Sequence, residues 1–511
     1  MEKSIYSQIC DHITDGILSD SFSLPDEVAG ASPLRFAPGA FDGMCMYHMR
    51  IDGLDADSTK EMAVALKAAA GGNFREADEL FHEWAKEHRA IRFIDDLQKY
   101  IMDHSSKLDP GRMHHSAVSL ILHSPYIESV KIGLEILELF NEPDEKTKEI
   151  IRRVGLYDEF TIFAVWNMLK WTNGNAEIFA LAKKTHSWGR IHAVERLEPK
   201  TEEIRRWLLT EGIVNDVMSA YSALPCWQKS QAEQILFRHP SPEEYKAIMT
   251  LIEGLMDEGP VPGISKLENA ENILLRFLEI AEDYDLTADD YDVILTIQQW
   301  ANDEDEPHPS VSKACGSVLQ SPRCTEAVET AVNEGKGLRL AEALGIPYLD
   351  KLFCCMKQDF ENYCYYCDHL MRNASYVQPT LDLFREKLPL SEIKGDPIAD
   401  PGLGREYEAY NQLQYILQEL DDKPLAGADL VKAGLESRIS RNRYRALSVL
   451  QSWVQEKDTP LSELAPDLFE AVGLLQAREI DKDKTEMITR LLEGQTHFYD
   501  DDEDEFEESE E

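Results

Sequence analysis

Hydrophobic residues recur at helical spacing from about residue 58 onward. The first clear stretch is residues 73–102, whose apolar face is formed by Phe74, Ala77, Leu80, Phe81 and Trp84. This spacing of three and four residues is typical of an α-helix with one buried side. Gly71 and Gly72 precede the stretch and suit a helix end. Residues 156–224 continue in the same style as four or five short helices with brief connections, which predicts antiparallel neighbours.

Residues 1–57 follow a different pattern. A short helix is predicted over Ser4–Leu18, and turn-forming Ser, Pro and Gly residues concentrate after it. Two short strands, Leu34–Phe36 and Met44–His48, would flank the turn-prone segment Gly39–Gly43 as a β-hairpin. We interpret residues 1–57 as a non-repeating cap, because the terminal units of a repeat array need a cover for their outer face.

Two helical segments share the pattern Arg-x-x-Ala-aliphatic-x-x-Leu. The matching residues are Arg190, Ala193, Val194 and Leu197 in one segment, and Arg443, Ala446, Leu447 and Leu450 in the other. The alanine lets two helices approach closely, the aliphatic residues can bury against the next pair, and the arginine can reach carboxylates or helix ends. This pattern, followed by a second helix, resembles armadillo and HEAT repeats. The resemblance implies a right-handed stack of helix pairs with a concave binding face.

The predicted fold is therefore all-α: a right-handed α-solenoid of degenerate armadillo/HEAT-like helix pairs behind an irregular N-terminal cap. After the cap at 1–57, residues 58–140 form a helical region that leads into the array. Residues 141–499 form the repeats. Residues 500–511 hold ten acids and no base, so we expect a disordered tail, because like charges repel.

The chain is strongly acidic. It holds 95 Asp and Glu residues against 52 Lys and Arg residues, which gives a formal net charge of −43 at pH 7. Such a surface repels phosphate backbones and anionic lipids, so nucleic-acid and membrane binding are disfavoured. Solubility alone would explain the charge, and the partner that it favours is a basic protein or peptide.

The cysteines and the N-terminal residues indicate a cytoplasmic protein. The nine cysteines are not spaced like a disulfide framework, and we expect reduced thiols. The first residues lack the basic and apolar regions of a signal peptide. No run approaches the roughly 20 apolar residues that span a bilayer.

One cysteine-rich segment is a weak candidate for a metal site. Cys364-x-x-Cys367, with His369 close by, has the spacing of half a zinc site, but a second pair is missing. Buried thiols in a helical core are the alternative, since cysteine packs as a small apolar side chain. Phosphate loops and dinucleotide fingerprints are incomplete, so we expect no cofactor and assign no catalytic residue.

A second resemblance covers most of the chain. The stretches Ser4–Pro25, Arg35–Met49 and Thr185–Pro199 are similar to those of a group of bacterial proteins that carry the label limonene hydroxylase. This resemblance implies an oxidoreductase, a monoterpene monooxygenase with alcohol dehydrogenase activity. Oxygen activation needs haem, flavin or iron, and the chain offers no complete motif for any of them, so no catalytic residue carries over.

The leading prediction is a non-enzymatic helical-repeat scaffold that binds a protein or peptide on its concave face. An acidic inhibitor or immunity-type protein that neutralises a basic effector is one form of this prediction. The hydroxylase-like oxidoreductase is the alternative, and the oligomeric state is left open. The candidate partner-binding residues are Asp42, His48, Trp188, Arg190 and Arg443.

Overall fold

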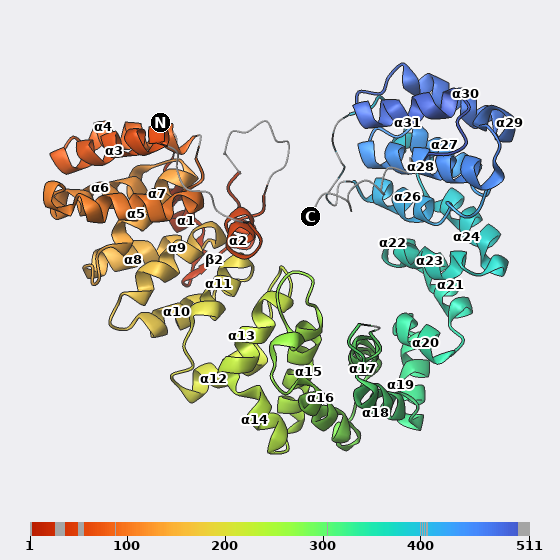
Figure 1. The fold of residues 1–511 in the computed structure, drawn as a ribbon, viewed down its shortest axis with the longest axis horizontal. Coiled ribbons are helices and arrows are strands. Elements are labelled where there is room, and N and C mark those ends of the chain that lie inside the picture. The colour runs from red at the N-terminus through yellow and green to blue at the C-terminus, as the bar shows by residue number, and fades with distance from the viewer. Residues whose placement is uncertain are drawn as a thin grey trace, which may run out of the picture. The chain divides into compact units, whose positions relative to one another are not determined.

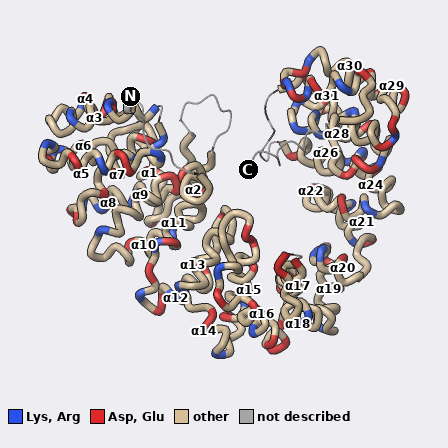
Figure 2. Tube along the Cα trace, in the orientation of Figure 1, with Lys and Arg blue, Asp and Glu red and all other residues tan. Residues whose placement is uncertain are grey.

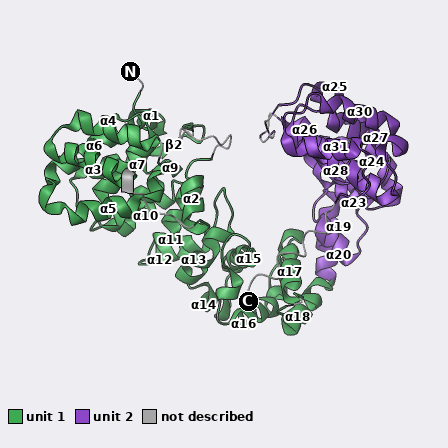
Figure 3. Ribbon diagram, turned by 45° about the horizontal axis from the view of Figure 1, so that its top comes forward, with its two compact units in different colours: residues 1–321 green, residues 322–511 purple. Residues whose placement is uncertain are grey.

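The chain is helical almost throughout (Figure 1). The structure is a computed structural model, and it describes residues 3–25, 36–49, 56–86, 88–303, 305–398, 400, 402, 404 and 407–498. It divides into two compact units, Met1–Ser321 and Pro322–Glu511 (Figure 3).

Unit 1 stacks helices so that neighbours in sequence are also neighbours in space, as in the pairs α3/α4, α6/α7 and α17/α18. Its helices are α1 (Ile5–Asp11), α2 (Ala40–Tyr47), α3 (Ala56–Gly71), α4 (Phe74–Ala85), α5 (Ile94–Asp103), α6 (Pro110–His123), α7 (Ile127–Glu138), α8 (Glu145–Val154), α9 (Asp158–Leu169), α10 (Gly174–Ala182), α11 (Trp188–Arg196), α12 (Glu202–Thr210), α13 (Ala220–Ser230), α14 (Ala232–Phe237), α15 (Pro242–Met256), α16 (Ala270–Glu279), α17 (Ala288–Ala301) and α18 (Pro309–Leu319).

Local signals in the sequence set where these helices begin. The Asp144 and Thr201 side chains accept backbone N–H groups at the starts of α8 and α12. Ser241 and Glu244 form a reciprocal capping box at the start of α15. Each such cap satisfies N–H groups that the helix itself leaves without partners, and contributes about 1 kcal/mol to helix stability.

Unit 2 continues the helix pairs, with α27/α28 and α30/α31 in close contact. Its helices are α19 (Pro322–Asn333), α20 (Leu338–Leu344), α21 (Leu349–Gln358), α22 (Phe360–Tyr363), α23 (Cys367–Met371), α24 (Ala374–Lys387), α25 (Leu390–Ile393), α26 (Glu408–Gln418), α27 (Ala428–Leu435), α28 (Ser440–Lys457), α29 (Leu461–Leu464), α30 (Pro466–Gln476) and α31 (Lys482–Leu492). Trp453 is fully buried, and its indole N–H donates to the carbonyl of Leu420.

A two-stranded hairpin, β1 (Ile13–Thr14) and β2 (Ile17–Leu18), follows α1 directly. Its two turn residues, Asp15 and Gly16, both have positive φ angles, of 52° and 75°, and Asp-Gly is a favoured pair for such a turn. The predicted helix over Ser4–Leu18 is therefore too long, because it ends at Asp11.

The hairpin predicted at Leu34–Phe36 and Met44–His48 is wrong. Met44 to Tyr47 belong to α2, and His48 is the residue that ends this helix. Gly39, with a φ of 73°, lies at the N-terminus of α2, and the helix buries Asp42, Gly43 and Cys45. Tertiary burial of this face outweighs the strand preference of the local sequence. Leu34 lies outside the described residues.

The all-α solenoid prediction is confirmed: packed helix pairs make up both units, and the described residues contain only this one two-stranded sheet. The boundaries predicted at residues 57 and 140 stay predictions, and the acidic tail at 500–511 lies outside the described residues. Across the described part of the chain, no helix combines the length and the apolar character that crossing a bilayer requires.

Candidate functional site

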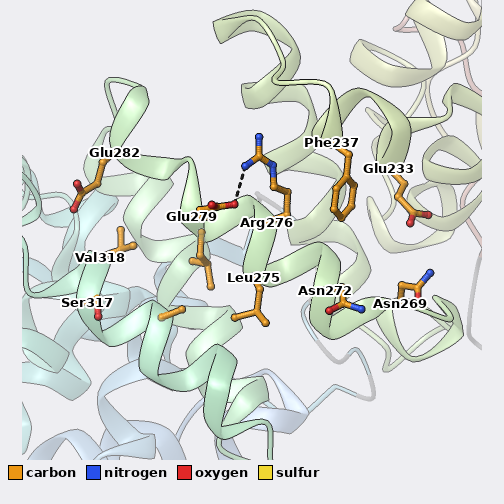
Figure 4. A pocket seen from close by; sticks show the side chains of 12 residues that line it. Glu233, Phe237, Asn269, Asn272, Leu275, Arg276, Glu279, Glu282, Ser317 and Val318 are labelled. Carbon is orange, nitrogen blue, oxygen red and sulfur yellow. Dashed lines mark hydrogen bonds and ion pairs between the residues drawn. The ribbon is translucent and has the colours of Figure 1, made fainter.

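An open groove in unit 1 lies between α14, α16 and α18 (Figure 4). Its volume is about 810 Å³, which is within the range of sites that hold ligands or peptide side chains. The residues that line it are Glu233, Phe237, Asn269, Asn272, Leu275, Arg276, Leu278, Glu279, Glu282, Ala314, Ser317 and Val318. Helix α16 contacts both α14 and α18, so the groove lies within one packed body.

The apolar part of the groove is formed by the core-facing residues of α16 and α18 and by one exposed aromatic ring. Leu278 and Val318 are buried, Leu275 is half-buried, and Phe237 at the end of α14 is 50% exposed. A phenyl ring that leaves half of its surface in water gains free energy when a partner covers it. The ring therefore offers a natural anchor position for an apolar side chain.

The charged part of the groove is mostly acidic. Glu233, Glu279 and Glu282 line it together with one cation, Arg276. The Arg276 guanidinium donates to Glu279 at 2.7 Å, one turn further along α16 (Figure 4). Three carboxylates against one guanidinium leave a negative excess at the groove edge.

The acidic character extends beyond the groove. Residues 277–312 hold eleven Asp and Glu residues and no Lys or Arg, and Figure 2 marks acidic positions in red along this part of the chain. On α15, the pKa of Glu253 is raised, first by burial and then by the charges of Asp292, Asp289 and Asp290 on α17. The carboxylates of α17 thus act on a group of the neighbouring helix α15, and their negative potential favours a cationic ligand.

The predicted residues Asp42, His48 and Trp188 lie together, because α2 packs against α7, α11 and α13. The Asp42 side chain is buried, and its Oδ2 lies 2.8 Å from the ammonium of Lys131 on α7. Gly43 packs so closely on Trp188 that an added Cβ would lie 2.2 Å from the indole ring. The His48 ring is bonded to the Tyr221 hydroxyl at 2.7 Å. These three residues hold α2 in place.

Lys131 is the centre of a buried charge cluster. Its ammonium lies 3.2 Å from Glu128 and 2.6 Å from Glu159, in addition to Asp42. The backbone N–H of Gly39 donates to Glu159 at 2.6 Å, which joins the start of α2 to the same cluster. Burial is the main cause that raises the pKa of Asp42 to about 7, and the carboxylates of Glu159 and Glu128 add to it.

An aromatic cluster extends from Trp188. The rings of Tyr47, His192 and Tyr221 lie within 4.9 to 6.2 Å of Trp188, measured between ring centroids. Burial, together with the charge of Arg196, lowers the pKa of His192 to about 3, so this ring stays neutral. The cluster is part of the core, and Trp188 itself is only 6% exposed.

The two arginines of the shared repeat pattern are buried to different extents. Arg443 is fully buried, donates to Glu479 at 2.6 and 3.0 Å, and bonds the Ser437 and Arg438 carbonyls after α27. Arg190 instead lies over the Trp207 ring at 5.3 Å, and burial lowers its pKa. Arg443 therefore takes the expected role at a carboxylate and a helix end.

The structure places the cysteine-rich segment inside unit 2. Burial raises the pKa of Cys364 to about 11, and that of Cys367 well above its usual value. His369 is bonded to the Tyr348 hydroxyl at 2.8 Å. In the described ranges, no three His, Cys, Asp or Glu side chains are arranged to hold a metal ion.

Sequence reasoning missed the groove and the Lys131 cluster. Helix α7 carries Glu128, Lys131 and Glu135 at intervals of three and four residues within an otherwise apolar segment. Charges on the buried face of a helix need partners, so this pattern could have indicated the cluster. The groove gathers residues between positions 233 and 318, and no single local pattern in the sequence covers it.

Comparison with known families and with curated proteins finds no match. Among solved structures, one similar chain is described as a circular tandem repeat protein with novel repeat topology and enhanced subunit contact surfaces. The two share 16% identity over 85% of this chain and 94% of that chain, with a TM-score of 0.14. Similarity at this score does not define the fold, which the packed helix pairs establish.

Proposed function

We propose that this protein is a non-enzymatic scaffold of the armadillo/HEAT-like kind that binds a basic, amphipathic protein segment in the groove between α14, α16 and α18. The observation that carries the proposal is the combination in one groove of an apolar floor with Phe237 and an edge of three carboxylates. A segment with both apolar and cationic side chains complements both parts. An acidic inhibitor that covers a basic effector would use such a groove.

The two parts of the groove contribute differently to binding. Covering the exposed half of Phe237 contributes about 1–2 kcal/mol, and each exposed ion pair adds only about 0.2–1 kcal/mol. The net charge of −43 raises the rate of encounter with a cation more than the affinity itself. Binding should therefore weaken with salt, while the apolar contact remains.

The test is fluorescence anisotropy of the full-length protein with a labelled amphipathic peptide made of Leu and Lys. A matched peptide in which Glu replaces every Lys tests the role of charge. We expect saturable binding of the Leu/Lys peptide that weakens with salt, and much weaker binding of the Leu/Glu peptide. Equal binding of both peptides, or of neither, would overturn the proposal.

Variants locate the site. Phe237→Ser should raise Kd roughly five- to thirtyfold, from the lost apolar contact. Glu282→Lys should raise it roughly two- to tenfold, because an attraction becomes a repulsion. Leu474→Ser and Glu470→Lys are the matched controls, since both residues are exposed on α30 in unit 2. If the controls weaken binding as much as the groove variants do, the peptide binds elsewhere.

A further inference from the structure

A second cavity, of about 410 Å³, lies in unit 1 beside the N-terminal hairpin. Its walls come from β2 and the residues after it, from Pro38, from the start of α9, and from the connection between α10 and α11. The volume falls in the usual range for small-molecule sites. The cavity is separate from the groove of the proposed function, since the two share no lining residue.

The wall after β2 is held in place by Tyr157. The Tyr157 hydroxyl accepts the backbone N–H of Leu24 at 2.9 Å. The Phe22 ring meets the Tyr157 ring edge-on, with 5.2 Å between centroids. Together with Leu18 and Leu156, these rings give the cavity an apolar surface. The cavity therefore has an apolar part, and its wall after β2 is tied to Tyr157.

Asp158 is one of the three carboxylates that line the cavity, with Asp20 and Asp216. Its Oδ1 accepts the backbone N–H groups of Gly189 at 2.7 Å and Ser187 at 3.3 Å, at the start of α11. Burial raises its pKa to about 6, although those two N–H groups lower it. The nearby imidazole of His186 also lowers the pKa of Asp158, and the charge of Asp216 raises it.

Groups of both charges line the same cavity. Lys184 and His186 lie in the connection between α10 and α11, and Asp216 is tied to that connection by its N–H, which donates to the His186 carbonyl at 2.8 Å. Within the described part of the chain, Lys184 forms no ion pair. A ligand with a single charge would meet like charges as well as opposite ones, so the lining favours a molecule with one charge of each sign.

We propose that this cavity binds a small zwitterion with an apolar body, of the class of a free apolar amino acid. Its ammonium group would pair with Asp158 and Asp216, its carboxylate would pair with Lys184, and its side chain would contact Phe22 and the leucines. The site needs no residue of the peptide groove, so either proposal can fail without the other.

The experiment is isothermal titration of the full-length protein with three probes that share one apolar body. L-leucine carries both charges, isoamylamine carries only the ammonium group, and isocaproate carries only the carboxylate. We expect saturable binding of L-leucine, and binding at least about tenfold weaker for the other two, because each lacks one charge-assisted hydrogen bond inside the cavity. No saturable binding of L-leucine below about 10 mM, or equal binding of the amine, would overturn the proposal.

Two variants at the edge of the cavity assign the charges. Lys184→Met should weaken L-leucine binding about tenfold and leave isoamylamine unchanged. Asp216→Asn should weaken L-leucine and isoamylamine and leave isocaproate unchanged. Lys183→Met is the matched control, because the neighbouring ammonium lies over the Phe179 ring at 4.1 Å and does not line the cavity. If Lys184→Met binds L-leucine as the wild type does, the proposed site is wrong.

Discussion

Replacing Lys131 with methionine removes a buried ammonium that contacts three carboxylates. Methionine has a similar length and fills similar space, so the change tests charge more than packing. Asp42, Glu128 and Glu159 then face one another at a site where Lys131 itself is fully buried. Part of the support remains, because Ala90 N–H donates to Glu128 at 2.7 Å.

We expect Lys131→Met to lower the free energy of unfolding by about 3–5 kcal/mol at pH 8, as for other broken buried ion pairs. The loss should shrink as the pH falls. Burial and like charges raise the pKa of Asp42 to about 7 even with Lys131 present, and removing the ammonium raises it further. A protonated carboxyl needs no counter-charge, so acid partly replaces the missing lysine.

The assay is hydrogen exchange of the full-length protein, followed in peptides from α2 and α7, together with urea unfolding at pH 8 and pH 6. Exchange reports the local stability of these helices even if the two units unfold separately. Lys67→Met is the control, because Lys67 is exposed on α3. Adding Asp42→Asn to Lys131→Met should recover about 1–3 kcal/mol, since it removes one of the uncompensated charges.

Two results would refute this reasoning. A Lys131→Met protein within about 1 kcal/mol of the wild type would mean that the ammonium does not hold the cluster. A double variant less stable than Lys131→Met alone would mean that Asp42 contributes a favourable contact other than its pair with Lys131. Faster exchange confined to α2 would instead support the view that the cluster mainly docks this helix.

Three further changes test other parts of the structure. For Asp42→Asn, stability relative to the wild type should rise by about 2–4 kcal/mol between pH 4.5 and pH 8, and a flat difference would contradict it. The pKa of Asp42 is raised from 3.8 to about 7 in the folded protein, so the wild type loses stability as Asp42 ionises with rising pH. Asparagine cannot ionise, so the variant does not lose this stability. Gly43→Ala should release α2, because the added Cβ would lie 2.2 Å from the Trp188 ring. Hydrogen exchange of α2 should then be faster than in the wild type. Unchanged protection would show that the indole moves aside. Arg443→Met should destabilise unit 2 by about 3–5 kcal/mol in urea unfolding, because Glu479 is left buried without its ion-pair partner. Adding Glu479→Gln should recover part of the loss. No recovery would mean that the hydrogen bonds from Arg443 to backbone carbonyls dominate.

The sequence by itself determined the helices of this protein. Apolar spacing and short connections indicated stacked helix pairs, and caps such as Ser241 and Glu244 set where helices begin. These signals are local, because a helix bonds its own backbone within four residues. The shared pattern predicted arginines that can reach carboxylates or helix ends, and Arg443 pairs with Glu479, whereas Arg190 lies over the Trp207 ring.

Tertiary structure alone decided what the N-terminal segment does. The residues from Met44 to Tyr47 have the composition of a strand, yet they are helical because Asp42 and Gly43 find their partners on α7 and α11. The sequence predicts Trp188 and His48 as partner-binding residues. The structure shows both of them in contacts within the chain. Whether they also meet a partner stays a prediction.

The groove and the cavity likewise depend on residues far apart in sequence. Phe237 and Val318 face one groove, and Leu18 and Asp216 line one cavity, only because the intervening helices stack. Local patterns encode which residues are apolar or charged, but which of them share a surface depends on how the helices pack. The physical reason is that burial and Coulomb interactions act through space, whereas helix formation acts along the chain.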